Sequence, residues 1–500
     1  MTTGWWMAPE QPRRPRRLRR LALLALLAAL FGASATAGWA LADPAAFGSA
    51  LDGVARLAPA VIAPAGAAAP APGADAGAVP AQAATPDAGA AATPPAAEAS
   101  TPAPTASPSA GAASPRPLAS TAAVPAPDVS AATAGRLDRA LARAQKALLL
   151  PGVEATVIFA DGSTWNGAAG LADVVAGRPV DPQTPFAVAS VTKTFTSALV
   201  LRYVDQGLIK LDDPLARWLP EWPNARKITI RMLLNHTSGI RDYFRNPKLD
   251  LALNRDKTRA WTPAEVLEAY VPKGAVFPPG KGWSYSNTNY LLLGAVAAEV
   301  GGAPWEDLVR RELIEPLGLD STYVQSVEEP PAPPALAYRI IDGFRGPTPE
   351  ARTDGSTVVP FRSVVTAAGS AGAIASTTGD LARWARALYG GSTVLSAATR
   401  REMLTFVKAY AYGLGTAYGL GASRVRFDGH TAYGHSGALV GTRAAIRYFP
   451  REKVTVAVLF NRETFVGDDV VRILARTIFP KPAAAPSPSP SVSPSPTPAP

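Results

Sequence analysis

The 500-residue sequence contains no cysteine, and this excludes disulfide bonds, thiolate nucleophiles and cysteine-ligated metal sites. The fold therefore has no covalent cross-link and must be held by packing. Acidic residues are also in the minority, with 39 Asp and Glu against 49 Lys and Arg. Half of the net charge of +10 comes from residues 1–42. The remainder is an ordinary surface balance, so the charge gives no argument for a nucleic-acid partner.

The first 42 residues have the pattern of a targeting segment. Six arginines precede a run without charge, Leu21 to Leu41, and Ala40-Leu41-Ala42 then offers an A-x-A cleavage site. The run is also long enough to span a bilayer, so a cleaved signal peptide and an uncleaved signal-anchor both remain open. Either places the rest of the chain outside the cytoplasm, anchored in the membrane or secreted.

Aromatic and β-branched residues are scarce in residues 43–133 and 482–500, which consist mainly of Ala, Pro, Ser, Thr and Gly. Such segments cannot bury enough apolar area to fold. We therefore expect a disordered linker over 43–133 and a disordered tail over 482–500. One globular unit remains, over residues 134–481.

Within this unit, the patterns predict strands near both ends and helices between them. Asp161-Gly162 joins two β-rich runs, as in a hairpin, and three consecutive strands are expected between 432 and 462. Helices are expected at the start of the unit, over 192–206, 231–235, 263–270 and 289–300, and over 468–479. The predicted fold class is α+β, with an antiparallel sheet flanked by N- and C-terminal helices and a mostly helical inserted region.

A serine and a lysine three residues apart, Ser190 and Lys193, lie where a strand is expected to lead into a helix. Such a pair occurs by chance roughly 0.6 times in a chain of this composition, so it proves little by itself. On a helix, however, both side chains would share a face, and a desolvated lysine can accept a proton from a serine nucleophile. The alternative is a helix-capping serine beside a solvated lysine.

Two further motifs follow along the chain. Tyr285 and Asn287 lie in a Pro/Gly-rich loop before a predicted helix, where a phenol and an amide can face one cavity. Their alternatives are a packed tyrosine ring and a helix-capping asparagine. His435-Ser436-Gly437 begins a predicted strand whose edge can receive a substrate. Its alternative is a β-bulge with a buried histidine.

In this order, the S-x-x-K, Y-S-N and H-S-G motifs resemble those of the serine β-lactamase and penicillin-binding-protein superfamily. Within it, the sequence is most similar to the branch of class C β-lactamases and D-alanyl-D-alanine carboxypeptidases of the H-T-G type. "LLNHTSGI", "FPPGKGWSYSNTNYLLLG" and "EPLGLDSTY" support the resemblance, which extends over essentially residues 135–479.

The resemblance implies a β-lactamase/transpeptidase-like fold and acyl transfer through an acyl-serine ester, with no metal and no cofactor. Ser190 would be the nucleophile, Lys193 its proton-relay partner and Tyr285 the general acid and base. Asn287, His435, Ser436 and Gly437 would bind the substrate, and the backbone N–H groups of Ser190 and Ala438 would form the oxyanion hole. His236, in "LLNHTSG", is interpreted as structural.

One departure from the pattern concerns charge. His435 replaces the lysine of class C β-lactamases, so the positive charge that would face a substrate carboxylate is lost unless this histidine is protonated. Arg424 and Arg426 lie just upstream, and either could supply the charge or be a solvated strand residue.

The leading functional hypothesis is a D-alanyl-D-alanine carboxypeptidase acting on peptidoglycan peptides in the cell envelope. A β-lactamase is the nearest alternative, followed by an esterase or D-aminopeptidase, and by a non-catalytic penicillin-binding sensor. The substrate would be an acyl-D-Ala-D-Ala peptide, a β-lactam or an ester. An α/β-hydrolase with Ser370 as nucleophile is a further alternative, from the near miss "AGSAG" to G-x-S-x-G. The oligomeric state is not predicted.

Overall fold

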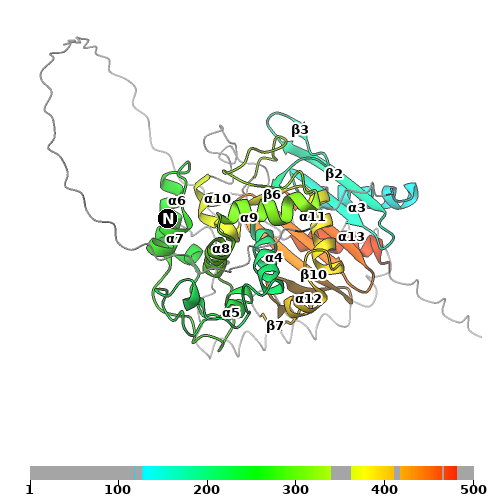
Figure 1. Ribbon diagram of the computed structural model, residues 1–500. Coiled ribbons are helices and arrows are strands. Elements are labelled where there is room, and N and C mark those ends of the chain that lie inside the picture. The colour runs from blue at the N-terminus through cyan, green and yellow to red at the C-terminus, as the bar shows by residue number, and fades with distance from the viewer. Residues whose placement is uncertain (1–117, 119–126, 339–361, 410–416, 464–466, 481–500) are drawn as a thin grey trace, which may run out of the picture. The chain divides into compact units, whose positions relative to one another are not determined.

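The computed structural model describes residues 118, 127–338, 362–409, 417–463 and 467–480 of the chain. These residues contain one large sheet, in which every neighbouring pair of strands is antiparallel (Figure 1). The strand order is β3-β2-β1-β12-β11-β10-β9-β8-β7. The strands are β1 (Gly152–Ile158), β2 (Thr164–Asp173), β3 (Arg178–Pro179), β7 (Val407–Lys408), β8 (Ala417–Tyr418), β9 (Ser423–Phe427), β10 (His430–Leu439), β11 (Thr442–Phe449) and β12 (Val454–Phe460).

The centre of this sheet joins the two ends of the described chain. β1 pairs with β12 along its length, with Val153 opposite Phe460, and every residue of both strands is buried. Burial on both faces is expected of strands that are covered by helices on either side. The β1–β2 hairpin turns at Asp161-Gly162, where Gly162 has a φ of +91° and the Asp161 carboxylate accepts the Ser163 N–H.

Two helices from opposite ends of the unit cover one face of the sheet. α3 (Ala131–Ala147) and α13 (Gly467–Ile478) contact each other and enclose a hydrophobic core with β1, β11 and β12 (Figure 1). Ser130 caps α3 by accepting the Thr133 N–H. The first three residues of the helix, 131–133, therefore overlap the end of the predicted linker, because the composition of a segment does not reveal a capping residue.

The other face carries α11 (Thr378–Ala385) and the inserted helical region. α4 (Thr192–Asp205) and α8 (Asn287–Gly301) are buried over most of their surfaces at its centre. α8 is largely apolar all round, as expected of a buried helix, whereas half of the residues of α4 are polar or charged. Around them lie α5 (Ile230–Leu234), α6 (Pro247–Arg255), α7 (Pro263–Tyr270), α9 (Trp305–Val309), α10 (Arg362–Ala368), α12 (Ala397–Met403) and a small sheet of β4 (Phe186–Ala187), β6 (Ile374–Ser376) and β5 (Tyr323–Val324).

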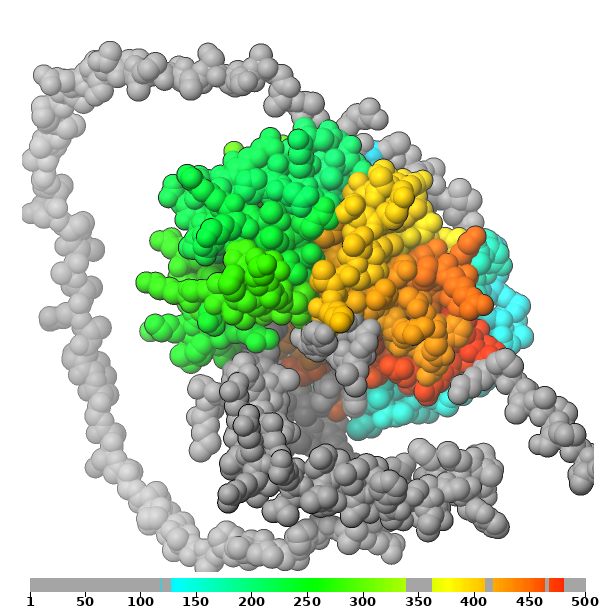
Figure 2. Space-filling view, turned by 90° about the horizontal axis from the view of Figure 1, so that it is seen from below, coloured from blue at the N-terminus to red at the C-terminus, as the bar shows by residue number. Residues whose placement is uncertain are grey.

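Figure 2 shows one face of the molecule, on which the green residues of the helical region and the orange residues of the sheet flank a yellow segment. By the colour bar, yellow marks residues of the stretch 362–409. The sheet and the helical region share one continuous core that runs from β11 and β12 through α4 and α8. Residues between the sheet and the helical region therefore pack against both.

The predicted α+β class is confirmed. The alternative of an α/β-hydrolase is wrong, because that fold requires a parallel sheet and this sheet is antiparallel. The predictions for 1–42, for nearly all of 43–133 and for 482–500 lie outside the described residues. In the part of the chain that the structure describes, no helix is both long and apolar enough to cross a membrane.

Candidate active site

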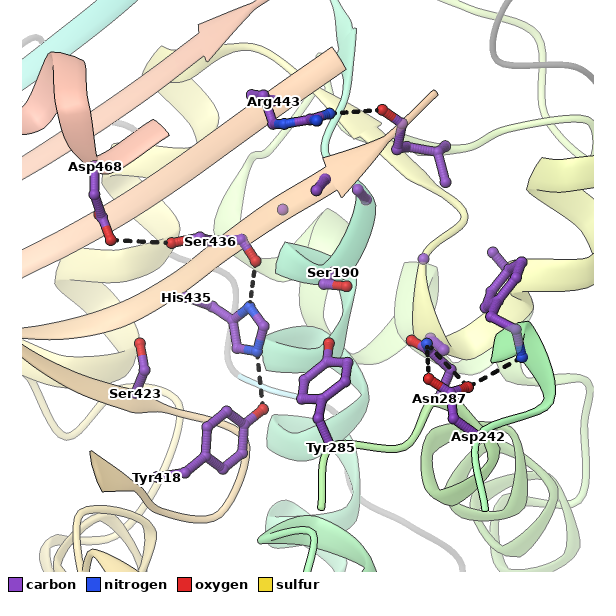
Figure 3. Close-up of a pocket in the computed structure, with 18 of the residues that line it drawn as sticks. Ser190, Asp242, Tyr285, Asn287, Tyr418, Ser423, His435, Ser436, Arg443 and Asp468 are labelled. Atoms are coloured by element: carbon purple, nitrogen blue, oxygen red, sulfur yellow. Dashed lines mark hydrogen bonds between the residues drawn. The ribbon is translucent and has the colours of Figure 1, made fainter. Parts of the chain in front are cut away.

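Ser190 lies in a 3₁₀ turn, Ala189–Val191, that leads from β4 into α4. Ala189 before it has a φ of +50°, a left-handed conformation that costs a residue with a side chain about 1–3 kcal/mol. The turn is held by the Val188 N–H, which donates to the Ile374 carbonyl at 3.0 Å. No side chain caps α4, so Ser190 is not the helix cap of the alternative interpretation. Its side chain instead lines a cavity (Figure 3).

Lys193 is on the first turn of α4 and is completely buried, which contradicts the alternative of a solvated lysine. Its Nζ atom donates to Ser190 Oγ at 3.2 Å, to Asn287 Oδ1 at 2.7 Å and to the Ala371 carbonyl at 2.8 Å. Burial lowers the pKa of Lys193 to about 7, and the Asp242 carboxylate counteracts part of this shift. A large share of the amine is therefore neutral at neutral pH.

Asn287 connects this lysine to a carboxylate that the sequence motifs did not single out. While Asn287 Oδ1 accepts from Lys193, Asn287 Nδ2 donates to both oxygens of Asp242, at 3.2 and 3.0 Å. Asp242 is itself buried, and its burial raises the pKa of the carboxyl group. The amide of Asn287 is thus fixed with its oxygen towards Lys193, and it does not cap α8. The only signal for Asp242 was its position two residues after "LLNHTSGI".

Tyr285 is near both Lys193 and the strand β10. Lys193 Nζ is 4.9 Å from the centroid of the Tyr285 ring, and the His435 ring centroid is 6.4 Å from it. Behind Tyr285, the buried ring of His236 packs at 4.4 Å between centroids. His236 Nδ1 accepts the Ser286 N–H at 3.2 Å, so this histidine holds the loop that carries Tyr285 and Asn287.

His435 is buried and neutral at neutral pH, because burial and the nearby Lys193 lower its pKa to about 3. Its Nδ1 lies 2.6 Å from the Ser436 carbonyl, which can only accept, so Nδ1 carries the proton. Nε2 must then accept from the Tyr418 hydroxyl at 2.8 Å. The charge that would replace the missing lysine is therefore not supplied by His435.

The second half of β10 forms an open edge beside Ser190. β10 pairs with β9 only as far as Gly434, whereas its pairing with β11 continues to Leu439. Gly437 lies against the turn before Ser190, since a Cβ atom built on it would lie 2.0 Å from the Val188 carbonyl oxygen. Ala438 follows, exposed to the cavity, so its backbone and that of Ser190 border the same space.

Neither upstream arginine lines this cavity. Arg424 and Arg426 are exposed, and the guanidinium of Arg424 stacks 4.8 Å from the Phe406 ring centroid. The intervening Ser423 and Val425 face the cavity instead, as strand alternation requires. Three other arginines line it, none of them singled out from the sequence: Arg245, Arg443 and Arg447.

The cavity encloses about 360 Å³ and is bordered by every residue of the three sequence motifs that was assigned a role except the buried Lys193. Ser370 is not among its lining residues, and its hydroxyl donates to the Tyr290 carbonyl at 2.9 Å. In the described ranges, no cluster of three or more His, Asp or Glu side chains could hold a metal ion. The arrangement offers a serine hydroxyl, a partly neutral amine beside it, a phenol and two backbone N–H groups, which are the components of acyl transfer to serine.

Comparison with known proteins gives a consistent result. The model of the family described as Beta-lactamase matches residues 137–478. Penicillin-binding protein 4 of Amycolatopsis lactamdurans is 31% identical over 62% of this chain and 81% of its own length. A D-aminopeptidase of Cereibacter sphaeroides is 27% identical over 68% of this chain and 63% of its own length.

The chain is also similar in fold to solved structures of hydrolases. A D-stereospecific amidohydrolase from Streptomyces sp. is 29% identical, with a TM-score of 0.58 over 70% of this chain and 99% of the neighbour. The D-amino acid amidase of Ochrobactrum anthropi SV3, complexed with L-phenylalanine, is 25% identical, with a TM-score of 0.61 over 70% of this chain and 98% of the neighbour.

Proposed function

The chain belongs to the beta-lactamase family and is a serine hydrolase of that fold, and we propose that it cleaves amide bonds of D-amino-acid peptides through an acyl-Ser190 intermediate outside the cytoplasm. One observation carries this proposal. A buried lysine, with its pKa lowered to about 7, lies 3.2 Å from the hydroxyl of Ser190. A neutral amine at that distance can accept the proton of the attacking hydroxyl.

In the proposed acylation, Ser190 Oγ attacks the substrate carbonyl carbon while its proton moves to Lys193 Nζ. The backbone N–H groups of Ser190 and Ala438 stabilise the oxyanion. The C–N bond then breaks, and Tyr285 gives its proton to the leaving nitrogen. Lys193, whose Nζ lies 4.9 Å from the centre of the Tyr285 ring, returns a proton to the phenolate.

Deacylation reverses these roles, and Tyr285 first passes its proton back to Lys193. Tyr285 is close to both Lys193 and His435, so its phenolate can then take a proton from a water molecule at the open edge of β10. The hydroxide oxygen attacks the acyl carbon, the bond to Ser190 Oγ breaks, and the serine recovers a proton from Lys193. Substrate enters as an amide and leaves as an amine and a carboxylic acid.

The mechanism is tested by intact-protein mass spectrometry with 4-nitrophenyl acetate, a small acyl donor without charge. We expect one acetyl group on the wild-type protein, located on Ser190, and none on Ser190→Ala. Ser370→Ala is the matched control, since Ser370 is buried outside the cavity, and it should be acetylated as fast as the wild type. Acetylation of Ser190→Ala at the wild-type rate would refute the proposal.

Hydrolysis of D-alanyl-D-alanine peptides by a carboxypeptidase remains the leading hypothesis for the specific reaction, and the similarity to penicillin-binding protein 4 supports it. A β-lactamase differs in the rate at which water clears the acyl-enzyme: release of a penicillin within seconds would favour it over the peptidase. Acylation of Ser190 once per molecule, without turnover of any peptide or ester, would support the alternative of a non-catalytic penicillin-binding sensor.

A second form, the hydrolysis of D-amino acid amides, is favoured by the neutral His435 and by the exposed position of Arg424. Neither residue presents a positive charge to a free carboxylate in the cavity.

The extracytoplasmic location rests on the arginines and apolar run of residues 1–42. We expect residues 1–126 to export a fused alkaline phosphatase, which is active only outside the bacterial cytoplasm. A fusion whose apolar run is interrupted by two arginines is the control. Equal activity of the two fusions would contradict the assignment.

A further inference from the structure

We infer that the end of the cavity beside Ser436 selects a leaving group that carries hydrogen-bond donors and rejects one that carries a free carboxylate. A peptide ending in a D-amino acid carboxamide fits this description. The inference rests on the proposed acyl transfer at Ser190 and specifies its substrate.

The two ends of the cavity are distinguished by the residues on either side of Ser190 (Figure 3). Asn287 and Asp242 lie on one side, where the acyl group is expected. His435 and Ser436 of β10, with Asp468 of α13, lie on the other, and we call these three residues the leaving-group end. His435 and Ser436 leave the strand on opposite faces, yet both border the cavity because the edge of β10 is open here.

Asp468 brings a negative charge to the leaving-group end. Its Oδ2 atom forms an ion pair with Arg447 Nη2 at 2.8 Å. The side chain of Arg447 is only 1% exposed, whereas that of Asp468 is 22% exposed. A ligand that approaches this pair therefore meets the carboxylate before the guanidinium. A second carboxylate placed there would be repelled.

The hydroxyl of Ser436 has no proton left for a substrate carboxylate. A serine hydroxyl has one donor and two acceptor positions. Ser436 donates its proton to Asp468 Oδ2 at 3.3 Å, and Arg447 Nη2 donates to the same Ser436 oxygen. What remains on this hydroxyl is one lone pair, which can accept an N–H group. The amide of a leaving D-amino acid carboxamide supplies such a donor.

The donors of two other basic residues near the cavity are engaged by backbone carbonyls. His435 is neutral, and its Nδ1 proton is used by the Ser436 carbonyl. Arg443 lines the cavity, but its guanidinium donates to the backbone carbonyls of Leu439 and Thr442, at 2.9 and 2.7 Å, and to that of Glu463. Arg245 lies three residues after Asp242 and ends the 3₁₀ turn Tyr243–Arg245, so it belongs to the segment of the acyl-side residue Asp242.

The cleavage itself follows the proposed mechanism. The amide bond between the acyl-D-alanyl group and the leaving residue breaks, Tyr285 protonates the nitrogen, and D-alaninamide leaves as a neutral amine. With a free terminal carboxylate, the same step would bring a negative charge towards Asp468 at the moment of departure.

The test compares two peptides that differ only at the C-terminus: diacetyl-L-Lys-D-Ala-D-Ala and its C-terminal carboxamide. We expect the wild-type protein to favour the carboxamide in kcat/KM at least about tenfold, since like charges in one cleft cost this much or more. Asp468→Asn keeps the side-chain volume and should reduce the preference by at least about tenfold, chiefly by improving cleavage of the acid. Asp469→Asn, the neighbouring residue outside the cavity lining, should leave the preference unchanged.

A measurement of peptide binding gives a second test that does not depend on the rate of peptide hydrolysis. Each peptide is used to protect Ser190 from acetylation by 4-nitrophenyl acetate, and the carboxamide should protect at the lower concentration. Equal or stronger protection by the acid, or an unchanged preference in Asp468→Asn, would overturn the inference while leaving the acyl-serine mechanism intact. Absence of any acetylation of Ser190 would instead contradict the proposed function.

Discussion

At the scale of single residues, the site is defined by groups whose ordinary ionisation is changed by burial. Lys193 and His435 are both enclosed, and both have a lowered pKa because a buried cation loses its hydration. Only the lysine has a carboxylate, Asp242, that partly restores its charge. This difference keeps the pKa of Lys193 near 7, where a proton acceptor is most effective at neutral pH.

Replacement of Asp242 by asparagine tests this balance. Asp242→Asn keeps an acceptor for Asn287 but removes the negative charge that raises the pKa of Lys193. The rate of Ser190 acetylation should rise with pH as Lys193 loses its proton. In Asp242→Asn the midpoint of this rise should lie about one pH unit lower than in the wild type.

The control for this experiment is Asp320→Asn, an exposed carboxylate outside the cavity. Its pH profile should coincide with that of the wild type. An unchanged midpoint in Asp242→Asn would show that Asp242 does not influence the lysine.

At the scale of elements, the expected helices and C-terminal strands were found, whereas the shortest strands were missed. The expected helices over 192–206 and 263–270 agree with α4 and α7, and the three expected C-terminal strands agree with β10, β11 and β12. The strands β7 and β8, of two residues each, were missed because two residues show no alternation. β9 was foreseen only through the alternative of Arg424 and Arg426 as solvated strand residues, and the cavity-lining role of its Ser423 and Val425 was missed.

The contact between β10 and the Ser190 turn gives a prediction at this scale. A methyl group added by Gly437→Ala would overlap the Val188 carbonyl oxygen, at 2.0 Å, and would push the strand away from the turn. We expect acetylation of Ser190 to slow by at least about 100-fold, because a displacement near 1 Å has this effect on aligned groups. The free energy of unfolding should fall by about 1–3 kcal/mol.

Gly379→Ala in α11 is the matched control, since its added methyl group would meet no atom closer than 3.8 Å. It should keep the wild-type rate of Ser190 acetylation in the same assay. The free energy of unfolding of both variants is measured by circular dichroism. Wild-type activity in Gly437→Ala would mean that the close approach of β10 is not needed.

At the scale of the whole molecule, the ends of the folded unit are joined in its core. The N-terminal strand β1 pairs with the C-terminal strand β12, and α3 packs against α13. The buried aliphatic residues of α13 are Val470, Val471, Leu474 and Ala475. Loss of either end would therefore expose the central strands.

A truncated protein tests this organisation. We expect residues 118–480 alone to fold and to be acetylated on Ser190 at the wild-type rate, because both hydrophobic clusters lie within this range. A shorter variant that ends at Asn461 lacks α13 and should not fold, since each buried aliphatic side chain that is lost costs about 2–5 kcal/mol. Thermal unfolding and intact-mass acetylation distinguish these results. An inactive or unfolded 118–480 fragment would contradict the predicted domain.

Part of the candidate site could be predicted from the sequence, and part of it could not. The amino-acid sequence was enough to find the catalytic and substrate-binding candidates Ser190, Lys193, Tyr285, Asn287 and His435, because those residues lie in short motifs with local spacing. It also indicated the α+β class, because alternation and helical periodicity are local properties of a chain.

The tertiary structure alone determined the charges in the cavity. Asp242 reaches Asn287 from 45 residues away, and Asp468 reaches Ser436 from 32 residues away. Burial, which makes Lys193 partly neutral and His435 fully so, depends on what the rest of the fold packs around each side chain. Such long-range proximity leaves no periodic trace in a sequence, so the motifs identify the nucleophile, and the packing decides which substrates suit it.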